Sequence, residues 1–267
     1  MFANLSRGLL SLYDYLVVYL GLLWLGILCL VYSVLAIPIY LLLPEAWGRK
    51  IGRIAIMLMF RVFLFSLVLS RRCHFDLAAL DTLRDESSLI IAPNHPSLLD
   101  AVLIISRLPN VACVLKTELM NNIFLGAGAR LAGYIRSEPL RKMILLSRQN
   151  LSSGSHLLLF PEGTRTVTCP VNPLKASISL IAHQSHAAVQ TVLIETDTRY
   201  LSKGWTLFRK PPLPIHFRIR LGKRFDTPGS KQDFMTKLDY YFAHELVCGS
   251  PFYRTGGLHS VIPPANV

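Results

Sequence analysis

The first part of the chain is almost continuously apolar. Residues 15–43 contain no charged side chain, and about 20 apolar residues are enough for a helix to cross the hydrocarbon core of a bilayer. The pattern therefore predicts one membrane-spanning helix over residues 15–43. A second apolar stretch, residues 51–70, contains Arg53 and Arg61, and arginine is costly at mid-membrane depth. We expect an interfacial or re-entrant helix there with its arginines at the lipid headgroups, or alternatively a buried core helix of the following domain.

The charges on either side of the first apolar run predict its orientation. Arg49, Lys50 and Arg53 follow the run, whereas Arg7 precedes it together with Asp14. Because positive charge collects on the cytosolic side of a membrane helix, we expect the rest of the chain to lie on the cytoplasmic face of the membrane.

After residue 72 the pattern changes to short apolar runs that alternate with helical periodicity. Strands are predicted near residues 73–77, 88–92, 111–115, 156–160, 188–195 and 213–221, and helices near residues 97–107, 139–152, 174–185 and 230–247. Such alternation is typical of an α/β domain with a mixed, largely parallel sheet flanked by helices. We therefore divide the chain into membrane-anchoring helices at 1–72, an α/β domain at 73–247 and a tail at 248–267.

Composition and charge narrow the classes of protein. Hydrophobic residues make up 52% of the chain and charged residues 16%, against about a quarter charged in ordinary soluble domains. This excludes a disordered or coiled-coil protein and argues against a freely soluble one. The net charge of +12 calls for an anionic partner such as anionic lipid or a phosphorylated substrate. The five cysteines form no C-x-x-C pair, which indicates a reducing compartment without a disulfide framework.

A histidine and an aspartate lie where a predicted strand gives way to a helix, in the segment NHPSLLD at residues 94–100. Parallel sheets build their sites at the carboxyl ends of strands, which places His95 at such an end. Asp100 falls in the first helical turn, within reach of the His95 ring, and a carboxylate on one imidazole nitrogen leaves the other free to take a proton. The spacing predicts a dyad that acts on a hydroxyl group, or alternatively a loop histidine beside a capping box of Ser97 and Asp100.

A second polar motif, FPEGTR at residues 160–165, follows another apolar run. It places the carboxylate of Glu162 and the guanidinium of Arg165 on one tight loop. Arg165 can bind a phosphate through two hydrogen bonds, and Gly163 lets the backbone approach a ligand closely. The alternative is a surface turn with an exposed ion pair, which contributes little.

In this order, behind an apolar N-terminal segment, the two motifs resemble the glycerolipid acyltransferase family, typified by lysophosphatidate (1-acylglycerol-3-phosphate) acyltransferases. The first family block, N-H-x-S-x-x-D, is matched by Asn94, His95, Ser97 and Asp100, and the third block, F-P-E-G-T-R, is matched at every position. The resemblance covers roughly residues 73–225. It implies that His95 is the general base, that Asp100 orients it, and that the third block binds the phosphate of the acceptor.

The resemblance also implies the substrate-binding residues, which are polar positions of the blocks and one lysine after the third: Asn94, Ser97, Arg136, Glu162, Gly163, Thr164, Arg165 and Lys175. For the second block either Arg136 or Arg141 can contact the phosphate, and we prefer Arg136. The chain departs from the family pattern around Gly133, after Lys175 and at Ala188. These departures leave the acceptor more open than the reaction.

The implied reaction moves an acyl group from acyl-CoA or acyl carrier protein to the hydroxyl of a lysophospholipid, first of all 1-acylglycerol-3-phosphate, giving phosphatidate in phospholipid biosynthesis. The sequence has no G-x-S-x-G motif and no cysteine near the histidine block, which favours direct transfer without an acyl-enzyme. Backbone N–H groups at the start of the 97–107 helix are candidates for stabilising the oxyanion. We expect membrane lipid and the acyl donor as partners, and no metal, cofactor or nucleic acid. The alternatives are the same chemistry on another lipid or a specialised acyl acceptor, or an inactive membrane lipid-binding protein.

Overall fold

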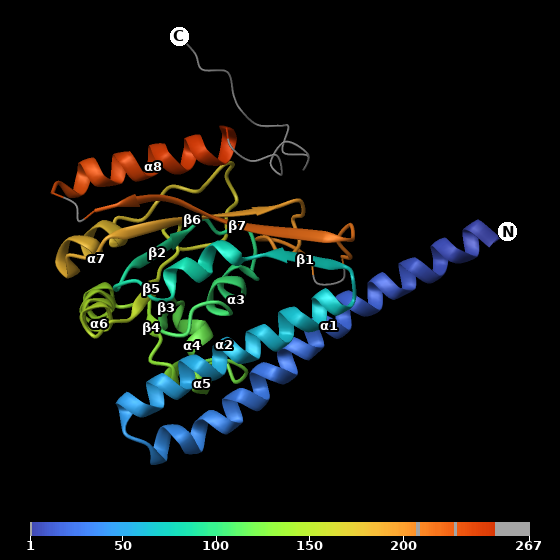
Figure 1. The fold of residues 1–267 in the computed structure, drawn as a ribbon, viewed down its shortest axis with the longest axis horizontal. Helices are drawn as coiled ribbons and strands as arrows, with labels where there is room; N and C mark the ends of the chain where they lie inside the picture. The colour runs from blue at the N-terminus through green and yellow to red at the C-terminus, as the bar shows by residue number, and fades with distance from the viewer. Residues whose placement is uncertain (1, 207–208, 227–228, 249–267) are drawn as a thin grey trace, which may run out of the picture.

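The computed structural model describes residues 2–206, 209–226 and 229–248. Two long helices, α1 (Phe2–Leu42) and α2 (Glu45–Leu69), form a hairpin along one side of an α/β domain (Figure 1). The elements of that domain are β1 (Cys73–Asp76), η1 (Ala78–Leu83), β2 (Ile90–Pro93), α3 (Asp100–Ile105), β3 (Val111–Leu115), α4 (Thr117–Met120), α5 (Gly126–Leu131), β4 (Ile135–Arg136), α6 (Leu140–Ser152), β5 (His156–Leu158), α7 (Ser177–Ser185), β6 (Val189–Thr196), β7 (Ile215–Phe225) and α8 (Lys231–Cys248).

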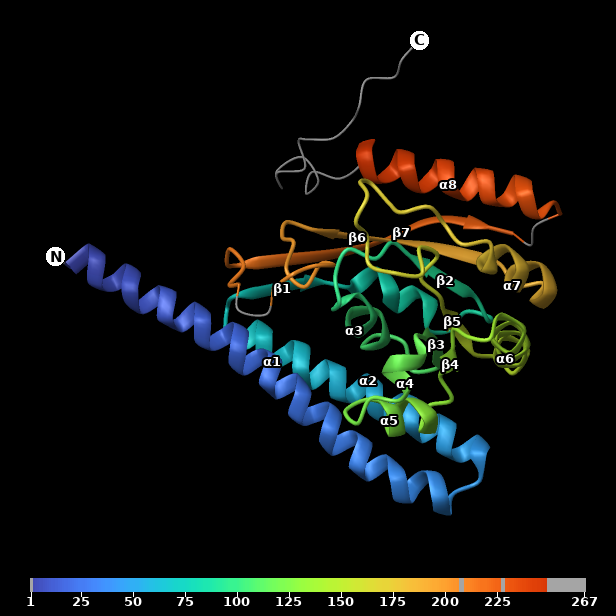
Figure 2. The same cartoon turned by 180° about the vertical axis from the view of Figure 1, so that it is seen from behind.

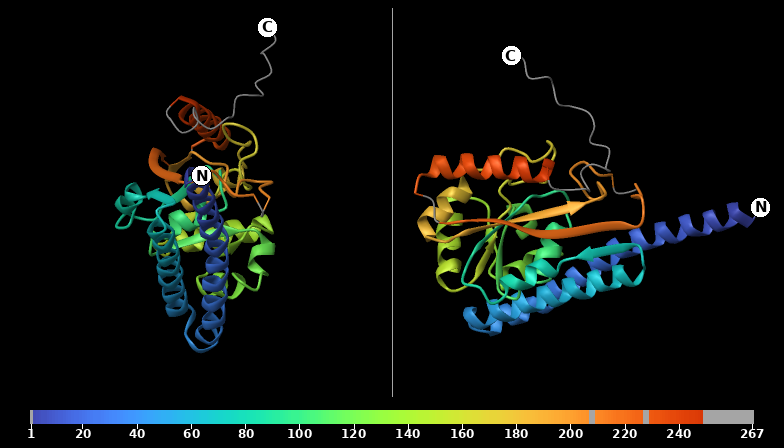
Figure 3. Two further views of the ribbon diagram at one scale, coloured as in Figure 1. Left: turned by 90° about the vertical axis from the view of Figure 1, so that its right-hand side faces the viewer. Right: turned by 45° about the horizontal axis from the view of Figure 1, so that its top comes forward.

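The strands form one seven-stranded sheet in the order β1-β7-β6-β2-β5-β3-β4. Only the β6–β7 pair is antiparallel, and all other neighbours are parallel. The helical hairpin and α3 cover one face of the sheet, while α6, α7 and α8 cover the other (Figures 2 and 3). The predicted mixed, largely parallel α/β fold is confirmed.

The hydrophobic pattern predicted each of the longer helices and strands of the domain close to its observed position. The clearest case is β7, where Ile215, Phe217 and Ile219 are buried and Arg218 between them is exposed. The predicted helix over 97–107 is shorter, because α3 begins only at Asp100. The short elements α4, α5, β4 and η1 were not predicted, and the expected tail lies, apart from its first residue, outside the described residues.

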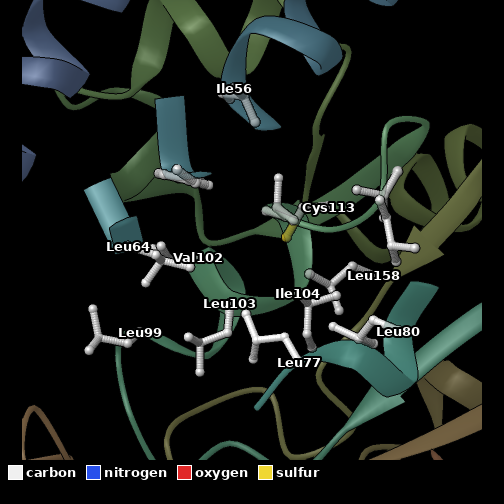
Figure 4. Close-up of a cluster of buried hydrophobic side chains, with 14 of the residues drawn as sticks. Ile56, Leu64, Leu77, Leu80, Leu99, Val102, Leu103, Ile104, Cys113 and Leu158 are labelled. Carbon is white, nitrogen blue, oxygen red and sulfur yellow. The ribbon is translucent and has the colours of Figure 1, made fainter. Parts of the chain in front are cut away.

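The helix α2 shares its hydrophobic core with the α/β domain. Ile56 and Leu64 of α2 lie in one buried cluster with Val102 and Leu103 of α3 (Figure 4). Gly52 brings the α2 backbone so close to α5 that an added Cβ would lie 2.9 Å from the backbone at residues 131 and 132. The inner face of α2 is therefore part of the core of the α/β domain, as the alternative interpretation of residues 51–70 predicted. The division of the chain at residue 72 stays a prediction.

The expectation that the α2 arginines lie at the lipid headgroups is wrong for Arg53. Its side chain is only 5% exposed. Its guanidinium donates hydrogen bonds of 2.6–2.9 Å to four neutral acceptors, namely Ala132 O, Asn110 Oδ1, Ser155 Oγ and Asn150 Oδ1. Arg61 likewise donates from Nε to the carbonyl of Ser106 at 2.7 Å. Residues of the α/β domain, including Asn150 on α6, supply the polar partners, so these arginines join α2 to the domain.

The outer faces of the hairpin are apolar. By length and composition alone, both helices are long enough and apolar enough to cross a membrane. In α1 the helix continues through Pro38 to Leu42. Exposed side chains include Leu41, Leu42 and Trp47, which are 73%, 81% and 65% exposed. An apolar surface of this kind marks a contact with lipid or with another protein.

Candidate active site

His95 and Asp100 meet at the carboxyl end of β2, as their spacing predicted. Nδ1 of His95 lies 2.8 Å from Oδ2 of Asp100. Asp100 is completely buried, and the side chain of His95 is 16% exposed. The His95 ring also stacks on Phe160, with ring centroids 3.9 Å apart. The imidazole is therefore held on one edge and one face, while part of it remains accessible to solvent.

Two hydrogen-bond donors lie against the buried carboxylate of Asp100. Its Oδ2 accepts the N–H of Ser97 at 2.8 Å in addition to the contact with His95. Burial raises the pKa of the Asp100 carboxyl above its usual value, and the hydrogen bonds from His95 and Ser97 oppose that shift. A carboxylate that accepts at Nδ1 fixes the proton there, so Nε2 of His95 carries the lone pair.

Glu162 ties the FPEGTR loop to the backbone of His95. Its Oε1 accepts hydrogen bonds from the His95 N–H at 2.8 Å and from Thr166 Oγ1 at 2.7 Å, and its Oε2 accepts the Asn172 N–H at 2.9 Å. The Thr166 N–H in turn donates to the His95 carbonyl at 2.7 Å. Glu162 is 2% exposed, and its carboxylate positions the loop of His95, while the contact with substrate stays a prediction.

The side chains of Asn94 and Ser97 also form hydrogen bonds to backbone groups of neighbouring segments. The side chain of Asn94 makes two hydrogen bonds to the backbone of Ile194 on β6, at 3.0 and 2.7 Å. Ser97 Oγ donates to the carbonyl of Tyr200 at 2.9 Å. Both side chains are 1% exposed, so in this structure they position backbone, and their predicted contact with substrate stays a prediction.

The predicted oxyanion donors at the start of α3 are engaged within the protein. The N–H groups of Ser97, Leu98, Leu99 and Asp100 donate to Asp100 Oδ2, Leu201 O, Ser97 Oγ and Ser97 O respectively. One of these acceptors, the Leu201 carbonyl, belongs to the loop after β6, which lies over this turn. In this structure these four N–H groups are therefore not free to act as the predicted oxyanion donors.

Two cationic side chains, Arg165 and Lys175, lie on or against the FPEGTR loop. Nη1 of Arg165 donates to the carbonyls of Leu201 and Ser202 at 2.8 and 3.1 Å, which fixes the guanidinium against the same loop. Lys175 crosses Gly163 so closely that a Cβ on the glycine would lie 2.5 Å from the lysine side chain. Gly163, at φ +66°, therefore makes room for Lys175 as well as for the turn. Thr164 is half-buried on the same loop.

Arg136 lies further along the same edge of the sheet. It ends β4, which is separated from β2 by β5 and β3, so three strand spacings of about 4.8 Å lie between them. Its Nη2 donates to Asn121 Oδ1 at 3.1 Å, and the side chain is exposed. Arg141 is exposed as well, on α6. The structure thus places Arg165 and Lys175 on or against the FPEGTR loop, which is bonded to the backbone of His95, and leaves Arg136 at the rim.

Sequence reasoning missed Thr166 and Asn172. Asn172 accepts the N–H groups of Val167 and Thr168 on Oδ1, both at 3.0 Å, and donates from Nδ2 to the Arg165 carbonyl at 3.1 Å. These bonds fix the chain after the FPEGTR motif. No spacing rule signals such a role, because an asparagine in a Pro-rich loop fits any turn.

Comparison with known proteins agrees with this geometry. Residues 74–195 match the family described as Acyltransferase. The crystal structure of the 1-acyl-sn-glycerophosphate (LPA) acyltransferase PlsC from Thermotoga maritima is similar, with a TM-score of 0.58 and 18% sequence identity over 91% of this chain and 96% of that chain. No curated protein sequence matches this chain. Residues 74–195 therefore form an acyltransferase-family domain, and the protein is an acyltransferase.

Proposed function

We propose that this enzyme transfers an acyl group from a thioester donor, acyl-CoA or acyl carrier protein, to the hydroxyl of 1-acylglycerol-3-phosphate, giving phosphatidate. The observation that carries the proposal is the contact of 2.8 Å between His95 and the buried Asp100, on a loop joined to the basic FPEGTR loop. A proton acceptor beside two cations suits an alcohol that also bears a phosphate. The fold is that of PlsC, whose acceptor carries both groups.

The reaction follows from the placement of the His95 ring. Nε2 removes the proton from the acceptor hydroxyl as the hydroxyl oxygen attacks the thioester carbonyl. The tetrahedral intermediate collapses, the C–S bond breaks, and the thiolate takes the proton back from the imidazolium. Asp100 stabilises the positive charge on the ring during these steps, and general-base assistance contributes about 10²–10⁴-fold to the rate.

Recognition of the phosphate falls to Arg165 and Lys175 in this proposal. Arg165 is fixed by two backbone carbonyls through Nη1, which orients the rest of its planar guanidinium. Lys175 is exposed and adds a second charge beside Gly163. Arg136, at the rim, is suited to a more distant anionic group of either substrate.

We further propose that the enzyme works at a membrane surface on the cytoplasmic side. Tyr32 and Ser33 of α1 donate hydrogen bonds to the carbonyls of Gly128 and Phe124 at 3.2 and 2.7 Å, and α2 packs on α3. Because both helices contact the domain, lipid cannot surround them. Their outer apolar faces, with the 73% exposed Ile123 beside them, fit insertion into one leaflet instead of the separate span expected for residues 15–43.

The test is an acceptor panel with the purified full chain in mixed micelles, using both donor types and mass spectrometry of the lipid products. His95→Ala should remove phosphatidate formation while the variant still shows a cooperative thermal unfolding curve. Phosphatidate formed at the wild-type rate by His95→Ala would refute the mechanism. If another lysolipid is acylated faster than 1-acylglycerol-3-phosphate, the reaction stands and the acceptor assignment fails.

A further inference from the structure

A cavity lies between the α1–α2 turn, α5 and α6, next to β4 at one end of the strand order. It has a volume of about 420 Å³ and is lined by residues of the α1–α2 turn, α5 and α6, among them Tyr40, Arg49, Arg130, Leu146 and Asn150. Small-molecule sites commonly have volumes of about 300–1,000 Å³. The catalytic proposal uses none of these residues, so the cavity needs an explanation of its own.

The charged side chains of the cavity favour an anion. Arg49 and Arg130 are the cations of its wall, and Glu45 is its only carboxylate within the described residues. Arg49 pairs with Glu45 one turn away on α2. The Glu45 side chain is 74% exposed, and exposed pairs of this kind contribute little. Arg49 can therefore exchange Glu45 for a ligand at small cost.

A third cation lies directly behind the wall. The buried guanidinium of Arg53 bonds to Asn150, which itself lines the cavity. In the described part of the chain Arg53 forms no ion pair, and its hydrogen-bond acceptors are all neutral. A buried charge without a counter-ion is costly and imposes a positive potential on its surroundings. An anion in the cavity would offset that potential.

The apolar part of the wall indicates what the anion is attached to. Tyr40, Leu43 and Leu146 line the cavity together with the arginines. The adjoining helix ends expose Leu42 and Trp47, which lie on the surface assigned above to the membrane. A ligand with an anionic head and an apolar chain satisfies both parts of the wall.

We propose that this cavity binds the phosphate headgroup of an anionic membrane phospholipid, at a site separate from the one that carries out acyl transfer. The proposal rests on the membrane placement in the proposed function. It does not depend on the identity of the acyl acceptor. Arg49 and Arg130 hold the phosphate, with Arg53 adding to the potential from behind.

The experiment measures binding of dihexanoyl phosphatidylglycerol to the full chain in a zwitterionic detergent by titration calorimetry. We expect Arg49→Gln and Arg130→Gln each to weaken binding about tenfold, the effect of losing one charge-assisted hydrogen bond. Lys50→Gln is the matched control, because Lys50 is an exposed cation next to Arg49 that does not line the cavity. Glu45→Gln should tighten binding. Equal losses in Lys50→Gln would overturn the proposal, since they would show general surface attraction.

Two further arms separate the sources of the phosphate and the two sites. Dihexanoyl phosphatidylcholine should bind at least tenfold more weakly than phosphatidylglycerol. Inorganic phosphate that binds as tightly as phosphatidylglycerol, with the same sensitivity to Arg49→Gln, would overturn the lipid assignment in favour of a free anion. With saturating micellar substrates, Arg49→Gln should keep the wild-type kcat, whereas His95→Ala should lose it and keep phosphatidylglycerol binding. Loss of both properties in either variant would overturn the separation of the sites.

Discussion

Replacing Asp100 with asparagine removes the charge beside the His95 ring while keeping the shape of the side chain. Oδ2 of Asp100 makes both hydrogen bonds of the group, and Oδ1 has no partner among the described residues. The asparagine oxygen can keep both bonds, with the amide nitrogen in the place of Oδ1. A buried NH2 group whose two N–H donors lack an acceptor costs at least about 1–3 kcal/mol, so Asp100→Asn should fold with reduced stability.

The effect on catalysis should be much larger than the effect on folding. During the reaction the imidazolium of His95 and the Asp100 carboxylate lie about 4 Å apart, centre to centre, and attract each other by about 4 kcal/mol at an effective dielectric constant of about 20. Each 1.36 kcal/mol is a factor of ten in rate. Asp100→Asn should therefore lower kcat about 10³-fold and leave the KM of the acceptor within about a factor of three.

The assay is the release of free thiol from the acyl donor, with 1-acylglycerol-3-phosphate in mixed micelles. Asp197→Asn is a matched control, because Oδ2 of Asp197 lies 2.6 Å from Nδ1 of His216 in a half-exposed pair that takes no part in the proposed chemistry. It should keep the wild-type kcat. A folded Asp100→Asn enzyme that works within tenfold of the wild-type rate would show that the carboxylate does not support a base at His95.

Three other changes test separate parts of the structure. Lys175→Gln should raise the KM for 1-acylglycerol-3-phosphate about tenfold, the effect of one charge-assisted contact, with kcat nearly unchanged in the same thiol assay. Arg53→Met leaves several buried acceptors without a donor, so urea unfolding in detergent should show about 3 kcal/mol lost stability; an unchanged midpoint would contradict its role in joining α2 to the domain. Burial lowers the pKa of His156 below its ordinary value of 6.5. As the pH falls through 6.5, the unfolded chain therefore takes up a proton at this histidine before the folded chain does. Stability should therefore fall as the pH drops below 6.5, and His156→Gln should flatten this dependence in urea titrations at pH 7.5 and 5.5.

The sequence predicted those parts of the fold that local pattern determines. The alternation in 213–221 gave β7, and the apolar runs at 88–92 and 156–160 gave β2 and β5, which the fold then pairs as parallel neighbours. Elements such as β4, with two residues, and α4, with four, are too short to show a period. The burial of Arg53 was missed for a different reason, because its partners come from residues 57 to 102 positions away.

In the candidate site, too, contacts between residues close in sequence were predicted and contacts between distant residues were not. His95 and Asp100 are only five positions apart, so their short separation at the junction of a strand and a helix was enough to suggest the contact, beside the alternative of a loop histidine. Glu162 and the His95 backbone are 67 positions apart, and the sequence suggested only that the glutamate touches substrate. A family motif records that a residue type is needed at a position, and the contacts in the fold decide whether it binds the ligand or holds the residue that does.

The bonds of Glu162 couple the two halves of the proposed chemistry. The loop of His95 follows β2 and the FPEGTR loop follows β5, and these strands are neighbours in the sheet. Glu162 and Thr166 join the two loops through backbone groups of His95, and Arg165 joins the second loop to the carbonyls after β6. A phosphate bound to Arg165 is therefore held by the same hydrogen-bonded group of loops that holds the imidazole of His95. This arrangement fixes the distance between base and phosphate, which is the condition for selecting an acceptor by the position of its hydroxyl relative to its phosphate.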